Sequence, residues 1–238
     1  ANVPANKDVI AVLERYRATT DHTALATNVL DAVANIPVTG VGINGGAGRI
    51  GVNLIMAWLK NPFGIEPRAI NDLDFKLQTT GENGAKAFAT YLERAFNIQK
   101  RGNIAGIKVK SGQDPDSGFY WISILGYRIT LSSEKNPEDL KWDTRGAKLV
   151  LEATGQFTEG KEDKDARRHF QGGTKTVVLT SPGKGDTVLT VSPGINPERI
   201  NPVANFYSCA SCTTSAAVAV LKVLIDNDLG RKEAQHVD

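Results

Sequence analysis

The stretch VGINGGAGRIGV, residues 41–52, decides the fold of this chain. An apolar run from Val38 leads into a glycine cluster at 45–51, and the amphipathic stretch 52–59 follows, which is the order strand, tight turn, helix. Residues 46–51 satisfy the dinucleotide-binding fingerprint G-x-G-x-x-G in that context. Its glycines let backbone amides approach a pyrophosphate at the N-terminus of the helix, so the pattern predicts a dinucleotide site.

An acidic residue follows the next apolar strand, which we place at Arg68–Asn71 and which ends at Asp72. A carboxylate at this point accepts hydrogen bonds from ribose hydroxyls and repels a 2′-phosphate, so Asp72 favours NAD over NADP. Glycine turns and acids at strand ends are also common in doubly wound folds that bind no nucleotide. The agreement of strand, helix and acid in one unit favours dinucleotide binding over that alternative.

Strands and helices alternate through the rest of the chain. We predict a loop at 79–84, a helix at 88–96, hairpin strands at 119–125 and 127–131, further strands at 149–152, 176–180 and 188–191, and a charged helix at 161–170. This alternation predicts an α/β fold, a Rossmann-type doubly wound and mainly parallel sheet. Helical spacing at 7–36 adds an N-terminal helical hairpin. The expected organisation is a helical extension at 1–37 and a dinucleotide-binding domain at 38–238.

Composition excludes several classes of function. The chain has 238 residues, 41% of them hydrophobic, and a formal net charge of only +2, which gives no reason to expect nucleic acid as a partner. Apolar stretches such as 216–225 are shorter than a membrane span of about 20 residues. The two cysteines make no disulfide framework, and with three histidines they match no metal-site spacing. We expect a soluble protein in a reducing compartment, in the cytosol or an organelle such as the plastid stroma, without a metal.

Segments in a fixed order carry a resemblance to a known family. They are 42–45, 48–51, 71–72, 140–142, 152–157 and 211–214. The sequence resembles the glyceraldehyde-3-phosphate dehydrogenase family over residues 41 to about 230. The resemblance implies the coenzyme-binding half of that enzyme, with NAD as the coenzyme. The coenzyme positions that it implies are Asn44, Gly45, Gly46, Gly48, Arg49, Ile50, Asp72, Lys135, Thr154, Gly155, Phe157 and Thr180.

The resemblance also implies a catalytic residue, Cys212. In the family the matching thiolate attacks an aldehyde, hydride passes to the nicotinamide, and phosphate cleaves the resulting thioester. A cysteine at the start of a helix suits this role, because the first-turn amides favour a thiolate. Cys209 and Cys212 also form a CxxC pair that could carry a reversible disulfide, although two buried structural thiols explain the pair equally well.

Departures from the family pattern bear on function. The glycine turn is one residue longer, with Gly46 or Ala47 as the addition, and Cys209 and Ser215 replace family asparagines. The histidine base and the large antiparallel sheet of the family have no counterpart, since His236 has different neighbours. We therefore expect a non-catalytic structural or adaptor subunit with protein partners or as an oligomer. The alternatives are a fragment of an active NAD-dependent dehydrogenase and a redox-sensitive module.

Overall fold

The computed structural model of this chain describes residues 38–61, 64–97, 106–158, 162–184, 187–201, 203–227 and 229. The helical extension expected at 1–37 lies outside these residues, as does His236. Residues 98–105 lie outside them as well.

The described residues form one sheet of nine strands in the order β3-β4-β5-β2-β1-β6-β7-β9-β8. All neighbours from β5 to β8 pair in parallel, whereas β3 and β4 are antiparallel additions beside β5. The order β5-β2-β1-β6-β7-β9 is that of a doubly wound Rossmann sheet, which confirms the predicted fold class. The strands are β1 (Thr39–Asn44), β2 (Ile65–Asn71), β3 (Val109–Gln113), β4 (Tyr120–Ile124), β5 (Tyr127–Ser132), β6 (Leu149–Glu152), β7 (Thr176–Leu179), β8 (Leu189–Thr190) and β9 (Phe206–Ser208).

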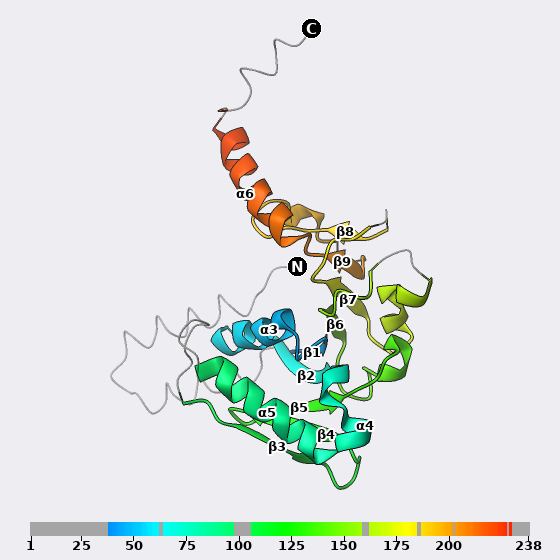
Figure 1. Ribbon diagram of the computed structural model, residues 1–238. Helices are drawn as coiled ribbons and strands as arrows, with labels where there is room; N and C mark the ends of the chain where they lie inside the picture. The colour runs from blue at the N-terminus through cyan, green and yellow to red at the C-terminus, as the bar shows by residue number, and fades with distance from the viewer. Residues whose placement is uncertain are drawn as a thin grey trace, which may run out of the picture.

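Helices α3 (Arg49–Lys60) and α5 (Glu82–Asn97) lie along one face of the sheet (Figure 1). Their apolar faces account for this packing: Ile55 of α3 and Leu92 of α5 are fully buried in one cluster with Ile129 of β5. Each such side chain contributes about 1.5 to 3 kcal/mol by leaving water. The short helix α4 (Leu77–Thr80) and the 3-10 turn η1 (Leu73–Phe75) connect β2 to α5.

The opposite face of the sheet is covered by turns around Trp142, including η3 (Pro137–Leu140) and η5 (Ala166–Phe170). Trp142 is fully buried against Val150 of β6. A Cβ atom at Gly42 would come within 2.6 Å of the Trp142 ring, so β1 passes the indole only because it carries glycine there.

Two local predictions need correction. The charged segment at 161–170 is not an α-helix, since its described part consists of two 3-10 turns, η4 (Glu162–Lys164) and η5. Asp165 divides them, because its carboxylate accepts from the amide of Arg167 and its backbone bridges to Thr158. The loop predicted at 79–84 is also too long. Helix α4 extends to Thr80, Gly81 alone breaks the helix at φ +53°, and α5 begins at once.

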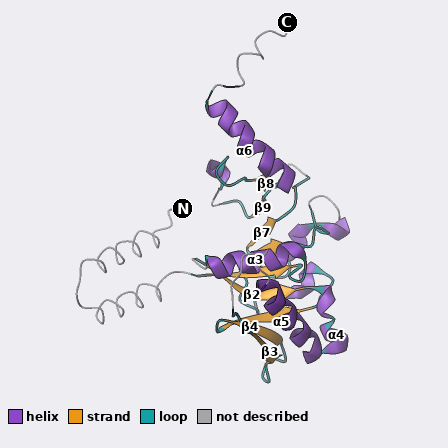
Figure 2. Ribbon diagram, turned by 60° about the vertical axis from the view of Figure 1, so that its left-hand side comes forward, coloured by secondary structure: helices purple, strands orange, loops and turns teal. Residues whose placement is uncertain are grey.

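Helix α6 (Cys212–Asp226) projects away from the sheet in both views (Figures 1 and 2). Ser211 caps its N-terminus by accepting from the amide of Thr214 at 2.9 Å. Apart from Lys222 and Asp226, residues 216–226 of this helix are all apolar, and none of the helix residues is buried. Within the described residues, no helix combines the length and hydropathy that a membrane span requires. A last 3-10 turn, η6 (Pro197–Arg199), lies between β8 and β9.

Candidate functional site

The carboxyl ends of the central strands form a cleft of about 720 Å³. Strand β1 pairs with β2 on one side and with β6 on the other. The chain therefore adds β2 and β5 to one side of β1, and then returns to add β6 and β7 to the other side. Doubly wound folds bind their ligands at this switch point. The volume lies within the range of small-molecule sites. The residues that line the cleft are Asn44, Gly45, Gly48, Asn71, Asp72, Leu73, Asp74, Glu134, Lys135, Asn136, Ala153, Thr154, Gln156, Phe157, Asp163, Lys164 and Arg168.

The glycine turn connects β1 to α3 at the edge of this cleft. The amides of Gly45 and Gly46 both donate to the Asn71 carbonyl of β2, at 2.8 and 3.2 Å, and Gly45 has φ +87°. A Cβ atom at Gly51 would lie 2.3 Å from the Gly45 carbonyl oxygen. The turn therefore folds directly onto the first turn of α3, and it needs glycine at both positions.

The N-terminus of α3 is suited to an anion. Gly48 occupies the N-cap without a side-chain hydrogen bond, and the first turn contains no acidic residue. The amides of Arg49 and Ile50 lie in this turn, where an α-helix offers no internal acceptor. An anionic group at the glycine turn would meet free donors and the positive end of the helix dipole.

Asp72 links this turn to the end of β2. Its Oδ2 accepts from the amide of Ala47 at 2.8 Å, and its Oδ1 accepts from the amide of Asp74 at 3.0 Å. A carboxylate has about four lone-pair sites, so two remain for a ligand's hydroxyl groups.

The structure brings seven of the sequence-predicted coenzyme residues together around the cleft: Asn44, Gly45, Gly48, Asp72, Lys135, Thr154 and Phe157. Gly46 instead packs on Ile70, and Thr180 donates its amide and hydroxyl to the Glu152 carbonyl, both at 3.0 Å. Arg49 and Ile50 open α3, and Gly155 lies in the turn after Thr154 with φ +68°. Cys212, which begins α6 beyond β9, does not line the cleft.

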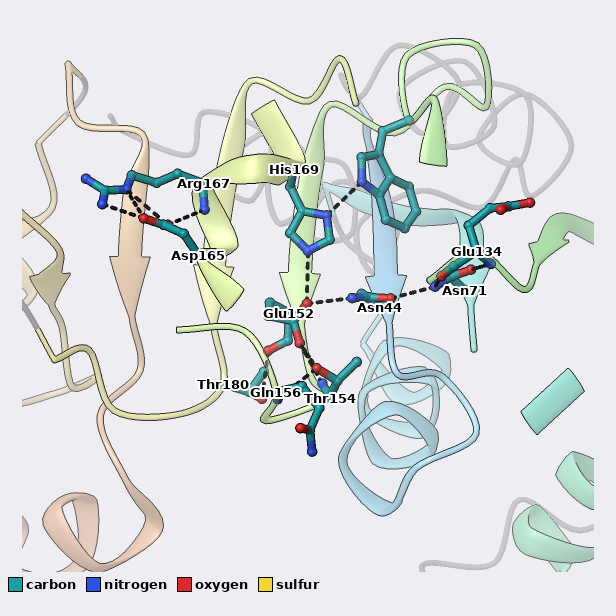
Figure 3. Close-up of polar contacts among 11 residues, drawn as sticks. Asn44, Asn71, Glu134, Glu152, Thr154, Gln156, Asp165, Arg167, His169 and Thr180 are labelled. Carbon is teal, nitrogen blue, oxygen red and sulfur yellow. Dashed lines mark hydrogen bonds and ion pairs between the residues drawn. The ribbon is translucent and has the colours of Figure 1, made fainter. Parts of the chain in front are cut away.

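A buried polar network lies behind the cleft, and sequence reasoning did not predict it. Glu152, at the end of β6, and His169, in η5, are both fully buried, and His169 Nε2 lies 2.9 Å from Glu152 Oε2 (Figure 3). The indole Nε1 of Trp142 donates to His169 Nδ1 at 3.0 Å. Since an indole nitrogen can only donate, Nδ1 is the acceptor and the ring proton is on Nε2, which donates to Glu152.

The network continues across the floor of the cleft. Asn44 Nδ2 donates to Glu152 Oε2 at 2.6 Å, and Asn71 Nδ2 donates to Asn44 Oδ1 at 2.8 Å and to the Glu134 carbonyl at 2.9 Å (Figure 3). The Glu134 amide donates back to Asn71 Oδ1 at 2.8 Å. Thr154 donates both its amide, at 2.8 Å, and its hydroxyl to Glu152 Oε1. The sequence did contain a signal for this network, because three polar residues, Asn44, Asn71 and Glu152, are the last residues of strands β1, β2 and β6.

Arg168, which lines the cleft, forms an ion pair with Glu138. Arg168 lies 2.5 Å from Glu138, and the guanidinium hydrogen bond holds the pKa of Glu138 below its ordinary value. Arg168 also donates to the Asp163 carbonyl, so it ties the 3-10 turns η4 and η5 to η3.

Cys209 and Cys212 lie on either side of the start of α6. Both have free thiols and are exposed as whole residues. Partial burial of its sulfur raises the pKa of Cys209 above the ordinary value for a thiol. Across the described ranges, no group of three or more His, Cys, Asp or Glu side chains is arranged to hold a metal ion.

The strand order, the glycine turn and the cleft at the switch point define a Rossmann-type α/β protein. Comparison with curated proteins finds glyceraldehyde-3-phosphate dehydrogenases. That of Streptomyces coelicolor is 35% identical over 189 residues, 79% of this chain and 49% of the relative. That of Chlamydia pneumoniae is 37% identical over 184 residues, 76% of this chain and 48% of the relative. The chloroplastic glyceraldehyde-3-phosphate dehydrogenase A of Zea mays is 35% identical over 186 residues, 77% of this chain and 40% of the relative.

These matches show that the chain is related to the glyceraldehyde-3-phosphate dehydrogenase family over part of the length of its members. The chain spans about half the length of the curated relatives it matches. A comparison with protein-family models finds no match.

Proposed function

We propose that this chain binds NAD in the cleft at the switch point. The observation that carries the proposal is the uncapped N-terminus of α3, which faces the glycine turn while Asp72 stands at the end of β2 beside the same cleft. The first-turn amides of Arg49 and Ile50 would bind the pyrophosphate, and the open lone pairs of Asp72 would accept from a ribose. Thr154 and Phe157 would contact the remainder of the coenzyme from the β6 side.

Calorimetric titration of the chain with NAD, NADP and ADP-ribose tests this proposal. NAD and ADP-ribose should bind, and NADP should bind more weakly because its 2′-phosphate meets the Asp72 carboxylate. Equal affinity for NAD and NADP would contradict the role of Asp72. No heat and no protection by NAD against thermal unfolding would contradict coenzyme binding itself.

The described residues alone favour coenzyme binding over catalysis. The histidine among them, His169, is fully buried between Trp142 and Glu152, so its ring nitrogens are both engaged away from solvent. It therefore cannot take a proton from Cys212, which is exposed at the start of α6. A histidine base for this thiol would have to come from residues other than the described ones.

A second candidate function is that of a non-catalytic structural or adaptor subunit in a larger assembly. Helix α6 favours it, because Val220, Leu221 and Ile225 are 61%, 53% and 61% exposed. Helices whose apolar residues extend around most of their circumference normally lie inside a larger protein body. Lys222 and Asp226 pair with each other at 3.1 Å and leave the rest of the helix uncharged. Covering this helix needs a protein surface, in another chain or in a longer form of this one.

Two measurements distinguish an adaptor from the coenzyme-binding part of an active dehydrogenase. Sedimentation at several concentrations, with Val220→Lys and Ile225→Lys as variants, tests whether α6 mediates association. A monomer at all concentrations, with no complex in native extract, would exclude the adaptor. Reduction of NAD by glyceraldehyde 3-phosphate and phosphate, lost on Cys212→Ser, would instead establish a dehydrogenase in which Cys212 attacks the aldehyde. Bound NAD would accept the hydride.

A further inference from the structure

Glu152 is fully buried, and its carboxylate accepts hydrogen bonds from two residues that line the cleft. Its Oε2 accepts from Asn44 of β1 at 2.6 Å, and its Oε1 accepts from the amide of Thr154 at 2.8 Å and from the Thr154 hydroxyl. Asn44, at the end of β1, and Thr154, just after the neighbouring strand β6, both line the cleft, whereas Glu152 itself does not line it. The carboxylate therefore acts on a ligand only through these two neighbours.

His169 completes this arrangement from behind. Its Nε2 donates to Glu152 Oε2, and its Nδ1 accepts from the indole of Trp142. The indole donates to Nδ1, so it fixes Nε2 as the ring nitrogen that donates to Glu152. The buried carboxylate thus accepts from four donors: the amide and hydroxyl of Thr154, the side chain of Asn44 and the ring of His169. A carboxylate offers about four lone-pair sites. All of the carboxylate's hydrogen-bonding capacity is thereby used inside the protein.

We propose that Glu152 is a positioning residue for the coenzyme cleft, and that His169 holds its carboxylate in the orientation that this requires. The proposal rests on the proposed function, since the positioned walls are those that would bind NAD. Its physical basis is preorganisation: the turn that carries Thr154 is held by two hydrogen bonds before any ligand arrives, so binding need not order it. The network also reaches Asn71 and the backbone of Glu134, which precedes the cleft residue Lys135.

Glu152→Gln removes the carboxylate that positions Thr154 and Asn44, while it keeps the volume of the side chain. An amide presents an NH₂ group on one side, which cannot accept from either set of donors. The amide oxygen should face His169 and Asn44, which are enclosed, and the NH₂ group should face Thr154, whose turn can move outward into the cleft. We expect the amide of Thr154 to lose its protection from hydrogen exchange by about tenfold or more, while the amide of Val150, in the core of β6, keeps its protection.

His169 offers a conservative variant and a disruptive one. In His169→Gln the side-chain NH₂ can donate to Glu152 and the oxygen can accept from Trp142, so Thr154 protection and NAD affinity should stay within about twofold of the original. His169→Leu supplies neither contact, and it should reproduce the effects of Glu152→Gln. Ser208→Ala is the matched control. Ser208 is a fully buried polar residue of β9 that binds Ser181 and Gly183, away from the cleft, so its loss should lower stability without affecting Thr154.

The deciding experiment measures hydrogen exchange in the coenzyme-free chain and NAD affinity in the same variants. We expect Glu152→Gln and Thr154→Val each to raise the Kd for NAD about tenfold, and the double variant to raise it by clearly less than the product of the two, because both changes remove the hydrogen bond from the Thr154 hydroxyl to residue 152. The proposal is supported if Thr154 selectively loses protection in Glu152→Gln and in His169→Leu, and keeps its protection in His169→Gln. It would be overturned by unchanged Thr154 protection in Glu152→Gln, by an equal loss of protection at Val150, or by a loss in His169→Gln as large as that in His169→Leu. If the original chain does not bind NAD, the proposed function fails, and the exchange data still decide the role of Glu152.

Discussion

The carboxylate of Asp72 accepts a hydrogen bond of 2.8 Å from the backbone amide of Ala47, which joins the end of β2 to the middle of the glycine turn. Sequence alone indicated Asp72 as a ribose ligand and the turn as longer by one residue than in the family. The structure connects these two features. The Ala47 amide donates to the acid, so the same carboxylate both supports the turn and lines the cleft.

Replacing Asp72 should therefore affect both the turn and the ligand. We expect Asp72→Ala to raise the Kd for NAD about ten- to hundredfold, since a hydrogen bond to a charged group contributes about 1.5 to 3 kcal/mol. Isothermal titration measures this change. Asp74→Asn is the control, because Asp74 lines the same cleft but binds Asp72 only through its backbone. NAD affinity unaffected by Asp72→Ala would exclude the acid from the site.

Two glycines of the fingerprint should respond differently to alanine. Gly51→Ala should lower the free energy of unfolding by about 1 to 3 kcal/mol, because its Cβ would lie 2.3 Å from the Gly45 carbonyl oxygen. Gly48 has φ −68°, and its Cβ would be 3.3 Å from the same atom, so Gly48→Ala should change stability by no more than about 0.5 kcal/mol. Gly48 lines the cleft, and its added methyl should weaken NAD binding. Urea unfolding and NAD titration separate the two effects. Equal stability of both variants would show that the turn is not packed as described.

The pair between Glu138 and Arg168 should make stability depend on acid pH. The pKa of Glu138 is lowered in the folded chain, chiefly by the hydrogen bond from Arg168, so the folded state binds this proton less tightly than the unfolded state. The contribution of this pair to the free energy of unfolding is fully present above the ordinary glutamate pKa of 4.5, and it is lost as the pH falls through the lower pKa of the folded chain. Glu138→Gln should flatten the decline of stability over this acid range and leave its slope near pH 7 unchanged. Urea unfolding at a series of pH values measures this, and an unaltered acid slope would contradict the prediction.

Alkylation should reveal the raised pKa of the Cys209 thiol. In a Cys212→Ser variant, iodoacetamide should label Cys209 more slowly at neutral pH than it labels a free cysteine peptide, because burial of the sulfur disfavours the reactive thiolate. The rate should rise as the pH is increased past the value for an ordinary thiol. Mass spectrometry follows the reaction. Labelling as fast as that of the peptide would show that the sulfur is not desolvated, and would restore the redox-sensitive module that the CxxC pair suggested.

The sequence by itself determined the fold class and the location of the cleft. The glycine cluster at 45–51 and the acid at 72 follow two parallel strands, and parallel strands end at one edge of the sheet, so local pattern sufficed. The helix predicted at 88–96 and the hairpin strands around 119–131 were found for the same reason, since their apolar periodicity is set by near neighbours. The segment at 161–170 was misjudged because the capping by Asp165 competes with helical propensity.

Only the tertiary structure decided what lies behind the cleft and what remains uncovered. Trp142, His169, Glu152 and Asn44 come from four separate segments, and no spacing along the chain relates an indole to the imidazole whose proton it places. The exposure of α6 likewise follows from its direction relative to the sheet, and not from its composition, which is that of a buried helix. Hydrophobic periodicity is local and is written in the sequence, whereas the partners of a buried polar group are fixed only when distant strands come together.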